Sequence, residues 1–156
     1  MIIVSSCLAG IECRYNGTHS LRKEIQQLVE QNKAVIVCPE LLGGFSTPRE
    51  PAEIVGGTGE DVLDGASKIV ERSGSDVTEL YVKGAYKTLE MANDMKAAMI
   101  VLKEYSPSCG SRMVYDGSFS NQRIPGEGVT AALLRRHGYT VVSETEFEEM
   151  LKNKDL

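Results

Sequence analysis

Three of the four cysteines in this 156-residue chain follow short apolar segments. Cys7 comes after an apolar start at 1–4 and two serines, Cys38 directly follows AVIV at 34–37, and Cys109 lies in the loop after AMIVL at 98–102. Such runs are typical of buried parallel strands. The carboxyl ends of parallel strands meet at one edge of the sheet, where ligands bind. We therefore expect three thiols that are distant in sequence to converge in space.

A converging set of thiols is suited to soft metals, since thiolates select zinc and iron–sulfur clusters. One cysteine alone is more often a small core hydrophobe, but three at matching positions favour a shared ligand. Cys13 supplies a fourth thiol in the loop that follows Cys7, which would complete a structural zinc site or a four-cysteine cluster. Paired C-x-x-C zinc knuckles do not occur in the sequence. Three cysteines without a fourth would leave one metal position open to a substrate.

Composition narrows the class of protein. The length fits one domain, 1–156. The net charge is −5, and the sequence has no basic stripe of the kind that binds duplex nucleic acid. The chain has no signal-peptide pattern and no apolar run of the roughly 20 residues that a membrane span needs. We expect a cytoplasmic protein that meets no membrane and no duplex. In that reducing compartment, cysteines serve as ligands or nucleophiles more often than as disulfides.

The pattern of apolar residues predicts the elements that must position these thiols. Strands are expected at 1–6, 34–37, 98–102 and 140–142, with helices at 20–31, from 76 or 78 to 95, at 128–137, and from the capping-box pattern SETE at 143–146 onward. Strands that alternate with helices favour an α/β fold. We expect a three-layer, Rossmann-like arrangement, with a mainly parallel sheet and helices on both faces.

The segments between these elements are predicted as turns and small hairpins. Pro39 is expected to end the strand at 34–37, so that a long loop begins at 38–40. The segments 54–57 and 61–65 look strand-like and predict a small hairpin off the main sheet. A second short hairpin is expected at 113–119, closed at Asp116–Gly117.

The loops that carry the cysteines resemble those of the thiouracil desulfidase family, once catalogued only as a domain of unknown function. The resemblance spans essentially the whole chain and rests on three separated blocks in the right order. These blocks are SCLAG at 6–10 with CRYNG at 13–17, CPE at 38–40 with GG at 43–44 and PR at 48–49, and KE at 103–104 with SPSCG at 106–110.

The resemblance implies a [4Fe-4S] cluster held by only three cysteines, Cys7, Cys38 and Cys109. It implies that the fourth iron takes the thiocarbonyl sulfur of a small thio-substituted pyrimidine such as thiouracil, and that sulfide is released without net electron transfer. Cys13 is then a spare thiol. The family pattern has Asp-Gly after Arg-Tyr, whereas this chain has Asn16-Gly17, so an acidic role at that position is not available.

The resemblance also implies an important glutamate at Glu40 and an important serine, with Ser106 as first choice and Ser108 as second. Glu40 is suited to act as general base for the attacking water, which a serine hydroxyl would position. The alternative for Glu40 is a carboxylate that begins a helix or braces a loop.

Three arginines neighbour the cysteine loops: Arg14, Arg49 and Arg112. Arg14 and Arg49 are candidates for binding the substrate. Each could equally brace a loop through Glu50, Glu53 or Asp116. Two other functions stay open at this point: an iron–sulfur carrier or electron-transfer module with Cys13 as fourth ligand, and a structural zinc-binding domain.

Overall fold

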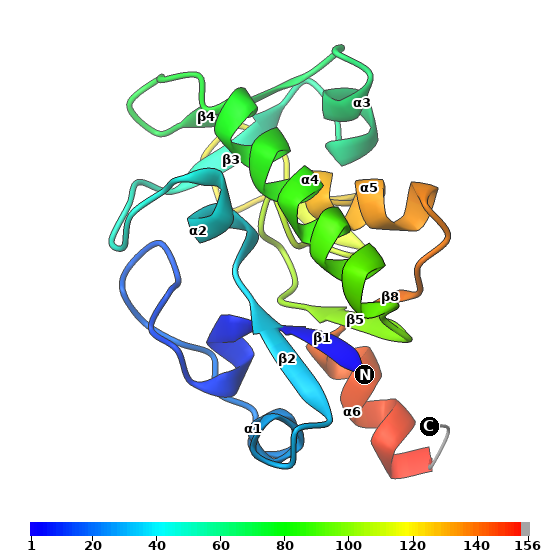
Figure 1. The fold of residues 1–156 in the computed structure, drawn as a ribbon. Coiled ribbons are helices and arrows are strands. Elements are labelled where there is room, and N and C mark those ends of the chain that lie inside the picture. Colours follow the sequence, from blue (N-terminus) through cyan, green and yellow to red (C-terminus); the bar gives the residue numbers. More distant parts are fainter. Residues whose placement is uncertain (154–156) are drawn as a thin grey trace.

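A four-stranded parallel sheet forms the centre of the structure, a computed structural model that describes residues 1–153 (Figure 1). The strand order is β2–β1–β5–β8, with β1 at Ile2–Ser5, β2 at Ala34–Val37, β5 at Met99–Leu102 and β8 at Val141–Ser143. Ser5 lies opposite Val37 on β2, and Val4 opposite Val101 on β5. The register therefore brings the carboxyl ends of β1, β2 and β5 to one edge of the sheet.

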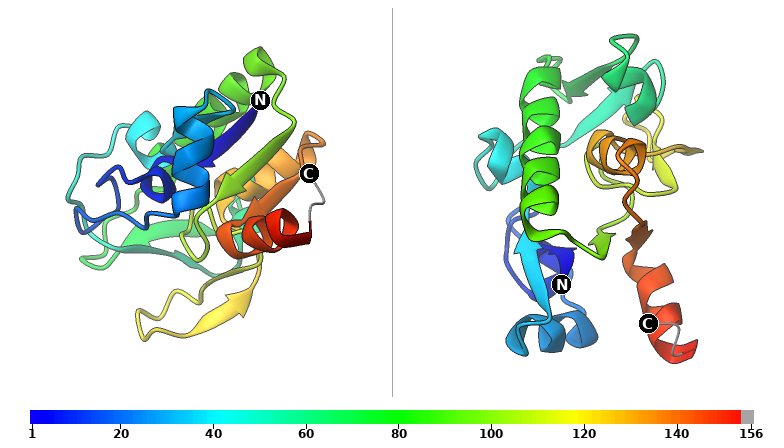
Figure 2. Two further views of the ribbon diagram at one scale, coloured as in Figure 1. Left: turned by 90° about the horizontal axis from the view of Figure 1, so that it is seen from below. Right: turned by 45° about the vertical axis from the view of Figure 1, so that its right-hand side comes forward.

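Helices cover both faces of this sheet, as predicted. Helix α4 (Thr78–Met95) and helix α5 (Val129–Arg136) lie side by side on one face, and α1 (Lys23–Glu30) and α6 (Glu144–Asn153) cover the other (Figure 2). Successive strand residues alternate between the two cores, so Ile100 packs toward α4 and α5 while Val101 packs toward α1 and α6. The three-layer α/β prediction is confirmed.

Two helix starts illustrate the local chemistry. The capping box at the start of α6 forms as the sequence predicted, because Ser143 Oγ accepts from the Glu146 N–H and a Glu146 carboxylate oxygen accepts from the Ser143 N–H. Helix α1 starts at Lys23, later than the predicted residue 20. The N–H groups of Ser20 and Arg22 instead donate to the carbonyls of Cys7 and Leu8. These two hydrogen bonds hold the segment at 20–22 against the turn that contains Cys7.

The prediction of a long loop from Cys38 is wrong, because a short helix, α2 (Pro39–Gly43), begins directly after it. Pro39 occupies the first helical turn, where its missing N–H removes no helical hydrogen bond. Helix α2 packs closely on α4, and only glycine fits at the contact. A Cβ added to Gly43 would overlap the Leu80 carbonyl oxygen, and one added to Gly84 would overlap the Pro39 carbonyl oxygen.

The middle of the chain forms a small antiparallel hairpin, but not from the predicted pair of segments. Strand β3 (Ala52–Val55) pairs with β4 (Lys68–Glu71), whereas the stretch predicted as a second strand at 61–65 lies mostly in helix α3 (Gly59–Leu63). A capping box in which Thr58 and Asp61 exchange hydrogen bonds starts α3. The Thr-x-x-Asp spacing is the sequence signal that identifies this helix.

A second hairpin joins β6 (Met113–Tyr115) to β7 (Arg123–Pro125). The predicted closure at Asp116–Gly117 is wrong, because the connecting loop is longer. The Asp116 N–H donates to the Gln122 carbonyl across its base, and the N–H groups of Gly117 and Phe119 donate to the carboxylate of Glu53 on β3. Strand β1 at the start of the chain is also shorter than the predicted 1–6, since a 3₁₀ helix, η1 (Ser6–Ala9), follows Ser5.

Among the helices formed by residues 1–153, none combines the length and apolarity that a membrane crossing requires.

Candidate functional site

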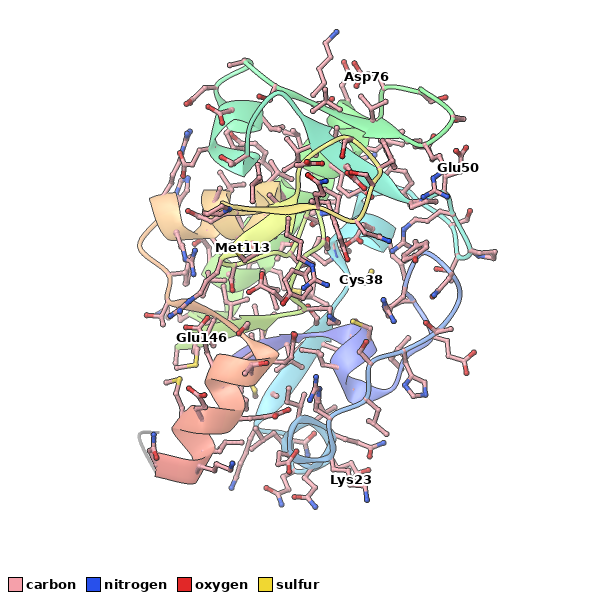
Figure 3. The ribbon with its side chains drawn as sticks, turned by 180° about the vertical axis from the view of Figure 1, so that it is seen from behind. Lys23, Cys38, Glu50, Asp76, Met113 and Glu146 are labelled. Atoms are coloured by element: carbon pink, nitrogen blue, oxygen red, sulfur yellow. The ribbon has the colours of Figure 1, made fainter. Side chains whose placement is uncertain are left out.

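A cavity of about 440 Å³ opens at the carboxyl ends of β1, β2 and β5. All four cysteines line it, together with Glu40, Arg49 and Ser106. Figure 3 places Cys38 near the middle of the molecule, between the sheet and the part that contains β3 and β4. The volume falls within the range of roughly 300–1,000 Å³ that is usual for small-molecule sites. The structure therefore brings the three predicted cysteines together at the predicted edge.

Cys7 and Cys38 reach the cavity from adjacent strands. Cys7 lies in η1, and its carbonyl accepts from the N–H groups of Gly10 and Ser20. Cys38 directly follows β2 and caps the start of α2. Cys13 is also buried, and its thiol lies beside those of Cys38 and Cys7. The fourth thiol thus belongs to the same cavity, although it follows no strand.

The Cys109 loop is held by its own serine and by helix α5. Ser106 Oγ accepts from the N–H groups of Ser108 at 2.9 Å and Cys109 at 3.0 Å. The first N–H groups of α5 donate back to the loop, from Val129 to the Pro107 carbonyl and from Thr130 to the Ser108 carbonyl. The N–H groups at a helix start have no intrahelical partners, so the carbonyls of the loop supply the hydrogen-bond acceptors that the start of α5 lacks.

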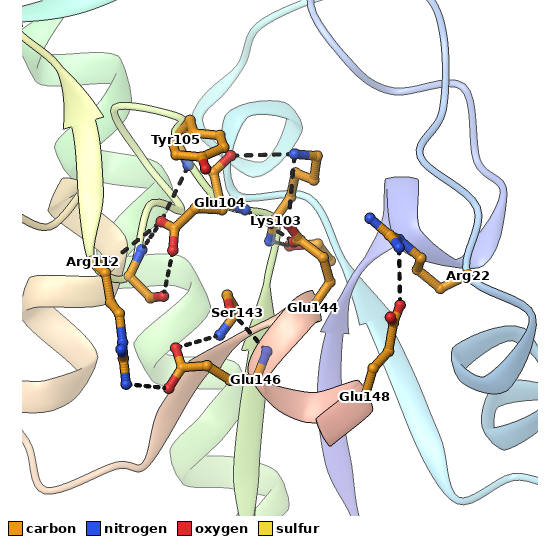
Figure 4. A network of polar contacts seen from close by, with 11 residues as sticks. Arg22, Lys103, Glu104, Tyr105, Arg112, Ser143, Glu144, Glu146 and Glu148 are labelled. Atoms are coloured by element: carbon orange, nitrogen blue, oxygen red, sulfur yellow. Dashed lines mark hydrogen bonds and ion pairs between the residues drawn. The ribbon is translucent and has the colours of Figure 1, made fainter. Parts of the chain in front are cut away.

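Glu104 organises the same loop, and sequence reasoning assigned it no role (Figure 4). One of its carboxylate oxygens accepts from the N–H groups of Tyr105, Ser111 and Arg112, at 3.2, 2.7 and 3.2 Å, and the other accepts from the Ser111 hydroxyl. The buried carboxylate of Glu144 accepts in turn from the Glu104 N–H at 3.0 Å. No local pattern marks Glu104, because most of its donors lie beyond the next turn.

Glu40 and Arg49 form an ion pair in the cavity wall. Their closest atoms, Glu40 Oε2 and Arg49 Nη2, are 3.2 Å apart, and the side chains are only 12% and 5% exposed. Burial lowers the pKa of Arg49 and the Glu40 carboxylate raises it, with a net upward shift. The other carboxylate oxygen of Glu40 lies 4.0 Å from Cys109 Sγ. The position of Glu40 in the first turn of α2 thus puts a carboxylate directly beside the thiols.

Three of the thiols in the cavity, those of Cys13, Cys38 and Cys109, have raised pKa values, which favours their protonated form. Burial, followed by the nearby Glu40 charge, raises the pKa of Cys109 well above its ordinary value. The contact with Cys13, together with burial, raises the pKa of Cys38. For Cys13, Cys38 lowers the pKa while Cys7 and burial raise it, with a net value of about 11. Ligating thiols must be deprotonated, so metal binding here would release protons and place negative charge in the cavity.

The other predicted residues take different positions. Ser106 lines the cavity, whereas the Ser108 hydroxyl is buried and shares a 2.7 Å hydrogen bond with Thr130. Arg14 lines the cavity and makes one long bond, 3.4 Å, to Thr18. Asn16 accepts from the N–H and hydroxyl of Thr18 through its side-chain oxygen, a turn contact that an aspartate makes equally well. Arg112 pairs with Glu146 at the surface.

The four thiols are the soft donors that the cavity offers to a metal group. Within residues 1–153, no three His, Cys, Asp or Glu side chains are close enough together to hold a single ion. A zinc ion would need its sulfur ligands about 2.3 Å away. Even so, three thiols from strand ends and the thiol of Cys13 line one cavity, and soft sulfur donors are the usual ligands of an iron–sulfur cluster.

Comparison with known proteins agrees with this site. The sequence profile of the family described as 2-thiouracil desulfurase matches residues 2–146. The uncharacterized protein YbbK of Bacillus subtilis (strain 168) is 63% identical over 151 residues, which cover 97% of this chain and all of that protein. The solved structure of TudS, described as a [4Fe-4S]-dependent thiouracil desulfidase, superposes with a TM-score of 0.85 at 39% identity, over 99% of this chain and 97% of that one. The predicted resemblance is confirmed: the chain belongs to the 2-thiouracil desulfurase family.

Proposed function

We propose that this protein is a [4Fe-4S]-dependent enzyme that removes sulfur, as sulfide, from a small thio-substituted heterocycle such as thiouracil. One observation carries the proposal. The thiols at the ends of three adjacent parallel strands face one cavity of small-molecule size, and a buried carboxylate lies 4.0 Å from one of them. The name of the solved relative, a [4Fe-4S]-dependent thiouracil desulfidase, supports the same cofactor and substrate class.

Cys7, Cys38 and Cys109 would hold the cluster. When bound, the cluster would supply a Lewis acid suited to a soft thiocarbonyl sulfur and to polarising the carbon–sulfur bond. Cys13 is proposed as the thiol that does not ligate, because it alone of the four does not follow a strand. Helix α2, the η1 turn and the Glu104 carboxylate fix the loops that carry the three proposed ligands.

Glu40 is proposed as the general base that takes a proton from the water attacking the substrate carbon. Its place in the cavity wall, with Oε1 4.0 Å from Cys109 Sγ, supports this role. Arg49 fixes the orientation of the carboxylate through the 3.2 Å contact to Oε2, while Oε1 faces the thiol. A positioned base of this kind contributes about 10²–10⁴-fold to a rate.

Ser106, rather than Ser108, is proposed as the serine that positions the water. The Ser106 hydroxyl oxygen acts as acceptor in both of its backbone hydrogen bonds, so the hydroxyl proton is available to a ligand in the cavity. The Ser108 hydroxyl is already engaged with Thr130 inside the protein. Arg14 is proposed to bind a substrate oxygen from the cavity wall, since Arg49 is committed to Glu40.

Anaerobic reconstitution with iron and sulfide tests the proposal. A desulfidase with a [4Fe-4S] site would become brown, bind about four irons and four sulfides per chain, and release sulfide and uracil from 2-thiouracil. Brown protein that binds the cluster and releases no sulfide would favour the second candidate, an iron–sulfur carrier. The observation that favours this second candidate is that Cys13 lines the same cavity, where it could serve as a fourth ligand.

A further inference from the structure

Tyr105 is a bulky residue in a backbone conformation that favours glycine. It lies between Glu104 and Ser106 on the loop that carries Cys109, and its φ is +77°. A positive φ is uncommon for a residue with a large side chain and points to a constraint worth explaining. Because glycine would take this conformation without strain, the backbone alone gives no reason for a tyrosine here. The side chain must supply that reason.

The strained backbone is held in place from several directions. The Tyr105 N–H donates to Glu104, whose carboxylate also fixes Ser111 and Arg112 on the far side of the loop (Figure 4). Tyr105 also forms an isolated bridge to Val114 on β6. These contacts fix the point from which the ring projects, so its position is determined before any ligand arrives.

Tyr105 is one of the residues that line the cavity. Two cations lie over its ring: the guanidinium of Arg123 on β7 at 3.8 Å from its centroid, and the ammonium of Lys103, a residue that lines the cavity, at 5.6 Å. The ring of Tyr115 lies 6.3 Å away at a tilt of 52°. Among the described residues, Tyr105 and Tyr115 line the cavity, whereas Arg123 is exposed and does not. Arg123 therefore clamps the ring from outside the cavity. Ser106, next in the chain, faces the same cavity.

We propose that Tyr105 determines specificity by stacking on the planar, conjugated ring of the substrate, so that flat thio-heterocycles bind in preference to puckered ones. The proposal rests on the proposed function. Stacking of a base on an aromatic side chain contributes about five- to a hundredfold to binding. The stack would set the plane of the ring, and with it the side from which the water held by Ser106 reaches the carbon.

Two ligands with the same polar groups and different shapes test this directly. Uracil is flat, whereas 5,6-dihydrouracil is puckered, and both present the same carbonyls and ring N–H groups. Dissociation constants from ligand-observed NMR on the cluster-free protein do not depend on turnover. We expect the wild type to bind uracil about tenfold more tightly than dihydrouracil. Equal affinity for the two ligands would overturn the proposal.

Three substitutions separate stacking from a structural role of the side chain. Tyr105→Phe keeps the flat ring and should keep the tenfold preference. Tyr105→Leu keeps apolar bulk, and Tyr105→Gly relieves the backbone strain; both should reduce the preference to less than about twofold. The melting temperature of Tyr105→Gly should be no lower than that of the wild type. If the Tyr105 side chain had only a structural role, this temperature would fall. Tyr86→Leu, at an exposed tyrosine on α4, is the matched control and should change neither quantity.

The outcomes distinguish this proposal from the proposed function. Full preference for uracil in Tyr105→Leu would overturn stacking, whatever the catalytic activity. Reconstituted wild-type protein that releases sulfide equally well from 2-thiouracil and its 5,6-dihydro form would also overturn stacking and leave the desulfidase function intact. Ligand discrimination without any sulfide release would support stacking and overturn the desulfidase function. Failure to bind either ring, with or without the cluster, would overturn both.

Discussion

Arg49 holds the carboxylate of Glu40 in the cavity wall through a contact of 3.2 Å between two side chains that are almost inaccessible to solvent. The two residues lie on opposite sides of the turn that follows α2, and the Arg49 N–H also donates to the Tyr15 carbonyl at 2.7 Å. The pair thus ties α2 to the loop that carries Cys13. It also decides which oxygen of Glu40 faces the thiols.

Arg49→Ala should destabilise the protein by about 3 kcal/mol, because removal of one partner leaves a buried charge uncompensated. Urea unfolding of the cluster-free protein measures this. Arg112→Ala is the matched control, since Arg112 also pairs with a glutamate but its side chain is 69% exposed. We expect that variant to lose less than about 1 kcal/mol. Equal losses in the two variants would show that the Glu40 pair does not differ from a surface ion pair.

Gly84→Ala should lower both stability and iron content, although alanine favours a helix more than glycine does. The added Cβ would overlap the Pro39 carbonyl oxygen, so α2 must shift and carry Cys38 and Glu40 with it. Overpacking of this kind costs about 1–3 kcal/mol. Thermal unfolding and iron analysis after reconstitution check the two effects. Lys87→Ala, at an exposed position of the same helix, should change neither.

Cys13→Ala should keep the cluster, whereas Cys38→Ala should lose it. The two thiols lie side by side in the cavity, so the pair of variants tests ligation at nearly the same place. Iron content and visible absorbance after anaerobic reconstitution are the measurements. Loss of the cluster in Cys13→Ala would contradict an open iron and would favour the carrier function.

Substitution of Ser106 should affect turnover, whereas substitution of Ser108 should affect stability. Ser106→Ala should slow sulfide release by about 10²-fold, a loss comparable to that of one positioned donor, and Ser106→Thr should restore part of the rate by keeping the hydroxyl. Ser108→Ala should destabilise the protein by about 1 kcal/mol through loss of the bond to Thr130, and leave turnover nearly unchanged. Steady-state kinetics and urea unfolding on all three variants give the comparison. A slow Ser108→Ala with a normal Ser106→Ala would reverse the assignment.

The convergence of Cys7, Cys38 and Cys109 was predictable because the topology alone controls it. A β-branched run such as 34–37 indicates a buried parallel strand, and parallel strands end at a common edge. The position of Glu40 was not predictable in the same way. Pro39 predicts the end of the strand at 34–37 and the start of a long loop, whereas in the structure it begins α2, and Glu40 in the first turn of that helix lines the cavity.

One overlooked local signal and several contacts between distant segments account for the other misses. The sequence suggested a strand at 61–65 because Val62 and Leu63 are apolar, but the Thr58–Asp61 capping box starts a helix instead. Glu104 belongs to a block that carries the family resemblance, but its role was not predictable, since its partners Ser111 and Arg112 reach it only after the Cys109 loop has turned back. The clamp of Arg123 on Tyr105 likewise depends on the hairpin of β6 and β7. Single-sequence patterns report local periodicity, and the contacts of Glu104 and Tyr105 with distant residues are not local.

The rate of sulfide release from 2-thiouracil, compared between wild type and Glu40→Gln at equal iron content, tests the central claim most directly. Glutamine keeps the size of the side chain and a hydrogen-bonding oxygen for Arg49 but cannot accept a proton from water. We predict that the wild type releases one sulfide per uracil formed, and that Glu40→Gln binds the same amount of iron but turns over about 10²–10⁴-fold more slowly. An iron-loaded wild type that releases no sulfide, or a Glu40→Gln variant with an unchanged rate, would contradict this account.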